Sequence, residues 1–85
     1  MAVVVVLPAI LAQEARSKRF ELEAATVGDA LRALPVADLL FDERGELRPL
    51  VNVFVDGIDM REHGGVETPL APGQTLRVVQ AVAGG

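Results

Sequence analysis

The sequence predicts an α+β fold in which a mixed sheet of four to five strands is covered by one packed helix. Two observations support this prediction. Strand-like runs of β-branched or alternating apolar residues occur near both ends of the chain and again in its middle. Only one stretch, starting at Thr26, repeats its apolar residues with helical spacing over more than two turns. With 85 residues, 51% of them apolar, the chain is suited to one small domain with a single core.

Two strands are expected near the start of the chain. The β-branched run at 3–7 is typical of a strand that is buried on both faces or lies at the centre of a sheet, and Pro8 ends it. Residues 19–24 alternate between apolar and charged side chains, which indicates a half-exposed strand. We expect the two strands to pair as a hairpin through the connection over 9–17.

The helix is expected over 26–34. Thr26 is a favourable N-cap, and Asp29 stands where a capping box places an acid. Val27, Ala30, Leu31 and Leu34 follow as one apolar stripe, and Pro35 then stops the helix. A second short helical turn is expected around 36–40.

The remaining strands lie in the second half of the chain. Residues 51–55 form the third strand, and Asp56-Gly57 predicts a tight hairpin into a short partner that begins at Ile58. Residues 75–82 form the last strand. The two end strands are the most apolar, so we expect them to lie side by side beneath the helix, in the β-grasp arrangement. The folded domain is then expected to span 1–81, with a flexible tail over 82–85. The expected core is Phe20, Leu22, Leu31, Leu34, Val53, Val55, Leu76 and Val78.

Composition excludes several kinds of function. The chain has no cysteine, which removes thiol nucleophiles, disulfides and thiolate metal sites together. A net charge of −4 argues against binding to nucleic acid and favours a partner with a basic or apolar docking surface. The apolar N-terminal run is interrupted by Pro8 and is too short to span a bilayer. We therefore expect a cytoplasmic protein that binds neither nucleic acid nor membrane.

The sequence ends in Gly84-Gly85, directly after the last expected strand. Glycine adds little to a folded terminus because it packs nothing and costs backbone entropy when it is ordered. It is useful where a backbone must enter a confined space without a side chain. The reactive group that such a tail presents is the Gly85 carboxylate.

The expected topology together with this ending resembles ubiquitin and, more closely, the ubiquitin-like sulfur carriers. The resemblance is carried by the stretch 51–57, by Asp59 and Arg61, by Thr68-Pro69-Leu70 and Gly73, and by the ending 81–85. These residues look like the small subunit of molybdopterin synthase, the thiamin sulfur carrier and the cysteine-synthesis carrier. The stretch 7–11 looks most like the cysteine type, whereas Gln80 departs from a proline often found in relatives.

This resemblance implies a function in which the carrier is a co-substrate and not an enzyme. An ATP-dependent enzyme similar to ubiquitin-activating enzymes adenylates the Gly85 carboxylate, and a sulfur donor converts it to a thiocarboxylate. A sulfur-accepting synthase then uses that sulfur, with a metalloprotease as a further partner if the pathway is of the cysteine type. No cofactor is expected on the carrier, because the activating partner consumes the ATP.

Strand alternation also predicts a docking surface. If Val53 and Val55 face the helix, Phe54 faces outward, and Val79 lies on the same face of the neighbouring last strand. An exposed apolar pair on a small acidic domain is a candidate partner site. The partner-binding residues are therefore expected to be Phe54, Val79, Ala81, Val82, Ala83 and Gly84, with Gly85 as the reacting residue.

Two other classes of function remain open. The first is a protein modifier, in which activated Gly85 is joined to a lysine of a target, as in ubiquitin. The second is an adaptor that docks through its sheet and never uses its tail. The destination of the sulfur is also open, and cysteine, molybdopterin, thiamin and thio-metabolites are the candidates.

Overall fold

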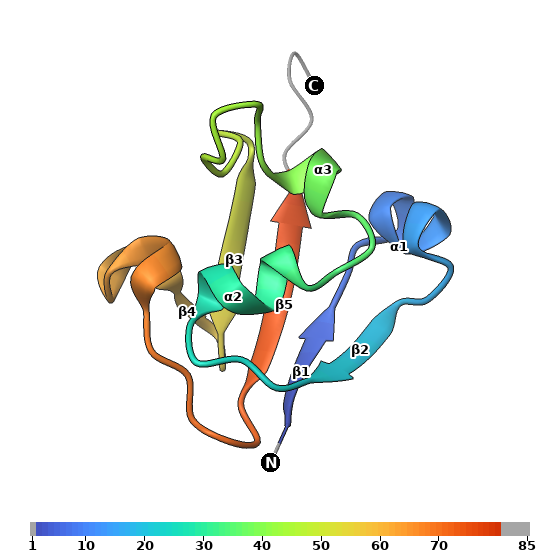
Figure 1. Ribbon diagram of the computed structural model, residues 1–85. Helices are drawn as coiled ribbons and strands as arrows, with labels where there is room; N and C mark the ends of the chain where they lie inside the picture. The colour runs from blue at the N-terminus through green and yellow to red at the C-terminus, as the bar shows by residue number, and fades with distance from the viewer. Residues whose placement is uncertain (1, 81–85) are drawn as a thin grey trace.

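The computed structural model describes residues 2–80, which form one five-stranded mixed sheet with helices on one of its faces (Figure 1). The strand order across the sheet is β2–β1–β5–β3–β4. The strands are β1 (Val3–Val6), β2 (Arg19–Leu22), β3 (Val51–Val55), β4 (Ile58–Asp59) and β5 (Thr75–Gln80). The helices are α1 (Ala9–Ala15), α2 (Val27–Arg32) and α3 (Ala37–Leu40), with short 3₁₀ turns η1 (Met60–Glu62) and η2 (Gly65–Glu67).

The two end strands are neighbours at the centre of the sheet, as the sequence predicts. Strand β1 runs parallel to β5, and Val5 lies opposite Leu76. The other three pairings are antiparallel. The β3–β4 hairpin turns through Asp56 and Gly57, whose φ angles of 49° and 86° are those of the tight turn that this dipeptide favours. The expected mixed sheet is therefore confirmed.

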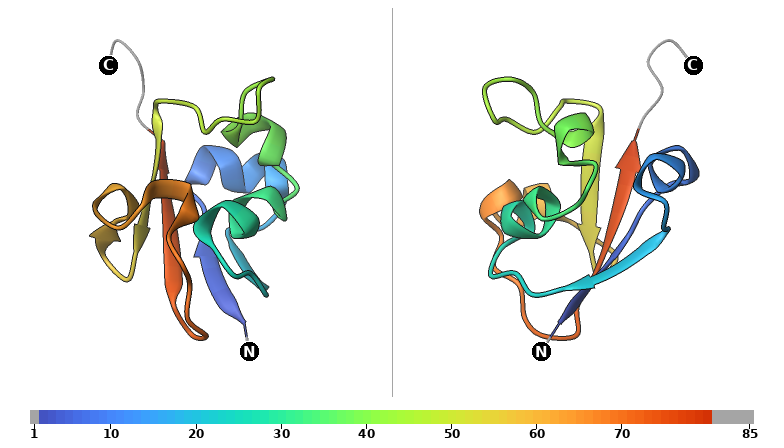
Figure 2. Two further views of the ribbon diagram at one scale, coloured as in Figure 1. Left: turned by 60° about the vertical axis from the view of Figure 1, so that its left-hand side comes forward. Right: turned by 45° about the vertical axis from the view of Figure 1, so that its right-hand side comes forward.

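Helix α2 confirms the expected amphipathic helix, although it ends at Arg32, two residues earlier than expected. The Thr26 Oγ1 accepts a hydrogen bond from the backbone N–H of Asp29 at 3.1 Å, so Thr26 is the N-cap. The expected turn around 36–40 is present as α3. Figure 2 shows that α2 and α3 lie on the same side of the sheet, which leaves the opposite face uncovered by helices.

The prediction of a single helix is wrong, because the connection between β1 and β2 contains α1. Pro8 occupies its N-cap position, and the Ala12 N–H donates to the Pro8 carbonyl at 2.8 Å. The segment is made of good helix formers, and it buries Leu11 in the core. Arg16 ends it in the left-handed conformation, with φ of 65°. The connection between β1 and β2 is therefore a helix with Leu11 buried, where the sequence predicted only a hairpin connection.

Six of the eight residues expected in the core are buried, and the other two are only partly buried. Phe20 and Leu22 are only partly buried, because β2 is the edge strand of the sheet and has a neighbour on one side only. The run at 3–7 is central but not buried on both faces, since Val4 and Val6 are half-buried on the uncovered face. The buried positions from the expected list are Leu31, Leu34, Val53, Val55, Leu76 and Val78.

We predict that Leu31→Ala lowers the free energy of unfolding by about 2–4 kcal/mol, because the side chain is fully buried and its removal leaves a cavity. Ile10→Ala is the matched control. Its side chain is 67% exposed, so its effect should stay within about 0.5 kcal/mol. Urea unfolding of the three proteins measures both changes. Equal costs for the two variants would contradict the assignment of the core to the helix-covered face.

Candidate functional site

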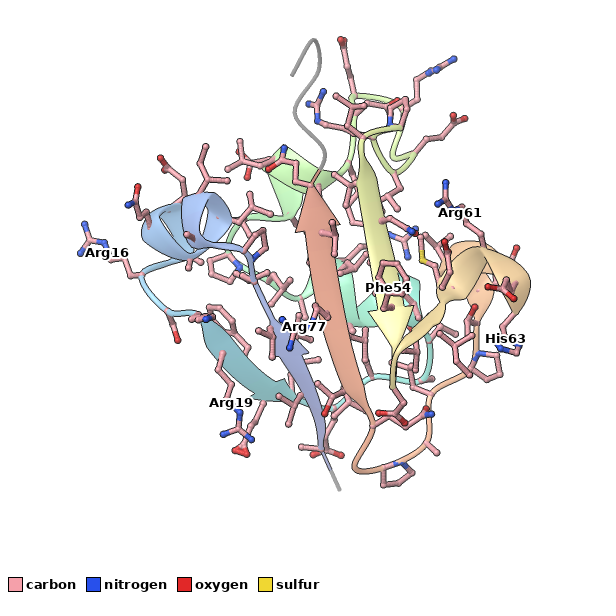
Figure 3. All side chains as sticks on the ribbon, turned by 180° about the vertical axis from the view of Figure 1, so that it is seen from behind. Arg16, Arg19, Phe54, Arg61, His63 and Arg77 are labelled. Atoms are coloured by element: carbon pink, nitrogen blue, oxygen red, sulfur yellow. The ribbon has the colours of Figure 1, made fainter. Side chains whose placement is uncertain are left out.

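The uncovered face of the sheet carries a row of side chains that crosses all five strands. Arg19 on β2 lies opposite Val6 on β1, and Val6 lies opposite Arg77 on β5. Arg77 in turn lies opposite Phe54 on β3, which lies opposite Asp59 on β4. Figure 3 views this face, with Arg77 near its centre and Phe54 on the neighbouring strand. We call this surface the open face.

Phe54 and Val79 lie on the open face as diagonal neighbours, since Val79 pairs with Asn52, two residues before Phe54 on β3. Phe54 is half-buried and Val79 is 40% exposed, and neither belongs to the core. A surface hollow of about 550 Å³ borders both side chains and Arg77. The outward orientation predicted from strand alternation is therefore confirmed, whereas the role of these residues in partner binding stays a prediction.

The other expected site residues are Ala81, Val82, Ala83, Gly84 and Gly85, and they lie outside the described residues. The described chain ends at Gln80, the last residue of β5. Because β5 is the middle strand, it reaches the edge of the open face with β1 on one side and β3 on the other. The end of the described chain therefore lies at the edge of the open face.

A polar cluster that sequence reasoning did not find borders Phe54. The Asp59 carboxylate accepts from Asn52 Nδ2 at 2.8 Å and from Arg61 Nη2 at 3.0 Å through Oδ2. Its Oδ1 accepts from the Arg61 backbone N–H at 2.9 Å and from Nε at 3.2 Å. The hydrogen bonds from Arg61 hold the pKa of Asp59 well below its ordinary value of 3.8. The sequence signal was the spacing of an acid two residues before an arginine at a hairpin end.

This cluster fixes Arg61 at one border of the open face and cancels its charge locally. The Arg61 pKa is raised in return by the hydrogen bond and the charge of Asp59. Asn52 reaches the cluster from β3, so the cluster also ties the short edge strand β4 to its neighbour. On the β4 side of the open face the charge of Arg61 is therefore balanced by Asp59, while Asp56 lines the hollow beside Phe54.

No group of three or more histidine, cysteine or carboxylate side chains among residues 2–80 is placed to hold a metal ion. Within the same range, no helix is long and apolar enough to cross a membrane.

The fold and the open face define the class of protein, which is a ubiquitin-like β-grasp domain. The crystal structure of SAMP1 from Haloferax volcanii superimposes with a TM-score of 0.84, at 31% identity over 100% of both chains. The Amycolatopsis orientalis BexX/CysO complex contains a chain that superimposes with a TM-score of 0.81, at 32% identity over 99% of this chain and 100% of that one.

Sequence comparison gives the family. An Archaeoglobus fulgidus protein described as a candidate sulfur carrier is 31% identical over 90 aligned residues that cover 100% of both chains. The ThiS family pattern matches residues 5–85. The chain belongs to the ThiS family, in agreement with the resemblance to sulfur carriers found in its sequence.

We predict that Val79→Asp weakens binding to a partner enzyme more than Phe54→Ala does, with the fold intact in both. A carboxylate at position 79 would have to be desolvated at an apolar contact, whereas truncation of Phe54 only removes contact area. Ile58→Asp is the matched control, because Ile58 is 48% exposed and pairs with Val55 away from the row that contains Phe54. Calorimetric titration measures the affinities, and equal losses for Val79→Asp and Ile58→Asp would contradict the docking role.

We predict that Asp59→Asn destabilises the protein at neutral pH and that the loss disappears in acid. A carboxyl group whose pKa is lowered in the folded state stabilises that state above its ordinary pKa, and the contribution is lost as the pH falls further. Thermal unfolding midpoints of wild type and variant should therefore differ at about pH 7 and converge towards about pH 2. Asp38→Asn, at an exposed carboxylate with no ion-pair partner among residues 2–80, is the control for the chemical change. A difference that persists unchanged in acid would refute the role of the Asp59 charge.

Proposed function

We propose that this chain is a sulfur carrier in which the Gly85 carboxylate is converted to a thiocarboxylate and then donates its sulfur in a biosynthetic reaction. The observation that carries the proposal is that the match to the ThiS family continues through Gly84-Gly85 and is not confined to the folded domain. The open face supports it, because that surface adjoins the strand from which residues 81–85 continue.

The chemistry requires activation because a carboxylate is a poor electrophile. In the first step a Gly85 carboxylate oxygen attacks the α-phosphorus of ATP, pyrophosphate leaves, and an acyl adenylate forms. In the second step a sulfide equivalent attacks the acyl carbon and AMP leaves, so that a C–S bond replaces the C–O bond to phosphate. Because the chain has no cysteine, its C-terminal acyl group is the position for covalent sulfur.

The protein contributes positioning, and its partners contribute catalysis. An adenylating and sulfur-transferring enzyme of the ubiquitin-activating type would act on Gly85, and a synthase would accept the sulfur. Holding the sulfur on a protein that docks against the acceptor makes the transfer effectively intramolecular. The BexX/CysO complex supports this view, since a similar carrier there is bound to another protein. In this account the chain is a co-substrate that binds no cofactor of its own.

We predict that incubation with the activating enzyme, ATP and sulfide increases the mass of the chain by the difference between sulfur and oxygen, and that the change maps to Gly85. Deletion of Gly85 should abolish the gain, because the carboxylate then ends one residue short of the activating centre. Gly84→Val should nearly abolish it, since a β-branched side chain stiffens the tail and fills the channel that receives it. Intact-protein mass spectrometry followed by C-terminal peptide mapping measures the change.

Reactions without ATP or without sulfide are the controls, and the thermal unfolding midpoint checks that both variants stay folded. Leu31 and the other core residues lie within 2–80, so neither the Gly85 deletion nor Gly84→Val should change the thermal unfolding midpoint. A sulfur gain that persists after deletion of Gly85 would refute the proposal. A full activity of the deletion variant in a partner-dependent assay would favour the adaptor function.

Protein modification is the second candidate function, and one observation favours it. The chain is 31% identical, over its full length, to a protein whose name describes a small archaeal modifier. In that function a lysine amine of a target attacks the Gly85 acyl group, AMP or an enzyme thiol leaves, and an isopeptide bond forms. Tryptic digestion of native cell extract would then leave a C-terminal fragment of this chain on target lysines. Its absence from extracts that contain the thiocarboxylate would restrict the chain to sulfur transfer.

A further inference from the structure

Most cations of the described chain that lack a carboxylate partner lie on β2, on β5 or in the turn before β2. Arg32, Arg44 and Arg61 each lie within 4.0 Å of a carboxylate oxygen. Among residues 2–80, the cations with no such partner are Arg16, Lys18, Arg19, Arg48 and Arg77. Four of these five lie on β5, on β2 or in the turn between α1 and β2, and Figure 3 shows Arg16, Arg19 and Arg77 on one side of the molecule.

Two of these cations border the same surface depression. It has a volume of about 270 Å³ and is lined by Lys18 and Arg77 together with apolar residues from β1 and its extension and from β5. Gln80, the last described residue, lies on its rim. The apolar lining consists of Val6, Leu7, Pro8, Ala9, Val78 and Val79.

The backbone around this depression is fixed. The Leu7 N–H donates to the Lys18 carbonyl at 2.8 Å, which extends the β1–β2 ladder to the base of the depression. Arg77 is held in register between Val6 and Phe54 on its two neighbouring strands. Arg77 belongs to a strand and Lys18 to the turn before β2, and no carboxylate among residues 2–80 lies within 4.0 Å of either side chain.

This local charge opposes the charge of the chain as a whole. The net charge of −4 favours a basic or apolar partner surface. Five of the twelve acids lie in α2, α3 and the turn after α3, on the helix-covered side of the sheet, and Glu21 lies on the open face opposite Val4. Charges farther apart than about 8 Å are largely screened at physiological salt, so a docking surface responds to the nearby cations and not to the average.

We propose that the depression between Lys18 and Arg77 binds carboxylate side chains of the activating enzyme, so that this partner presents an acidic, apolar-centred surface to the open face. The inference rests on the proposed function and specifies the chemistry of its first partner. A guanidinium donates two hydrogen bonds to a carboxylate in bidentate geometry, and Val6, Pro8 and Val79 offer apolar surface around that contact. The occupant is a protein surface because the depression and the hollow beside Phe54 are neighbours that share Arg77 and Val79, so one partner surface can cover both.

The chain offers a single-residue test because Lys18 is its only lysine. A zero-length carbodiimide joins an amine to a carboxylate that it contacts. Treatment of the complex with the activating enzyme should give a cross-link between Lys18 and an aspartate or glutamate of the enzyme, and Lys18→Arg should remove it. Complex formation without any enzyme cross-link at Lys18, or with the same cross-link yield after Arg77→Glu, would overturn the proposal.

Kinetics give an independent measurement. Arg77→Glu should raise the KM for the carrier in the adenylation reaction by about tenfold or more, weaken the dependence of KM on salt, and leave kcat unchanged. Arg32→Glu is the matched control, because it makes the same change of charge on α2, on the opposite side of the sheet. Equal KM values for the two variants would refute the site. Because wild type is adenylated and thiocarboxylated in either case, this failure is distinguishable from failure of the proposed function, in which wild type itself gains no sulfur.

Discussion

The parallel pairing of β1 with β5 is the contact on which the rest of the structure depends. It joins the two ends of the described chain at the centre of the sheet, with Val5 opposite Leu76, and both of these side chains are fully buried beneath the helices. Every other strand is added outward from this pair. Strand β5 is held by a neighbour on both sides up to Gln80, the last described residue.

The helices cover only one face of the sheet, and this arrangement has a consequence for function. The helices supply apolar cover for alternate residues of each strand, and the intervening residues form the open face. That face is divided electrostatically. On the β4 side the charge of Arg61 is cancelled by Asp59, whereas Arg19 on β2 and Arg77 on the middle strand β5 have no carboxylate within 4.0 Å among residues 2–80. A partner that docks on this face therefore meets apolar side chains of β1, β3 and β5 with Arg77 among them.

Local sequence signals predicted the elements that depend on local chemistry. The Thr26 cap, the Asp56-Gly57 turn and the alternation of β3 each follow from neighbouring residues, and all three are confirmed. Helix α1 was missed because it is short and owes its stability to the burial of Leu11, a tertiary contact that no local pattern reports. The depression between Lys18 and Arg77 was missed because it joins residues 59 positions apart through two strand pairings, and because net charge gives no information on where charges lie. The proposed role of Gly85 rests on the family resemblance, and no packing argument bears on it.

The most direct test of the account is the chemical state of Gly85 in the cells that make this protein. The chain would be isolated from them under alkylating conditions, which trap a thiocarboxylate as a thioester adduct, and its C-terminal peptide would be analysed by mass spectrometry. Since the chain has no cysteine, an adduct on this peptide reports on Gly85 alone. The account predicts a population of chains that carry sulfur at Gly85 and that disappears when the activating enzyme is removed. A C-terminal peptide found only as the carboxylate, in cells where the activating enzyme and its sulfur source are present, would contradict the account.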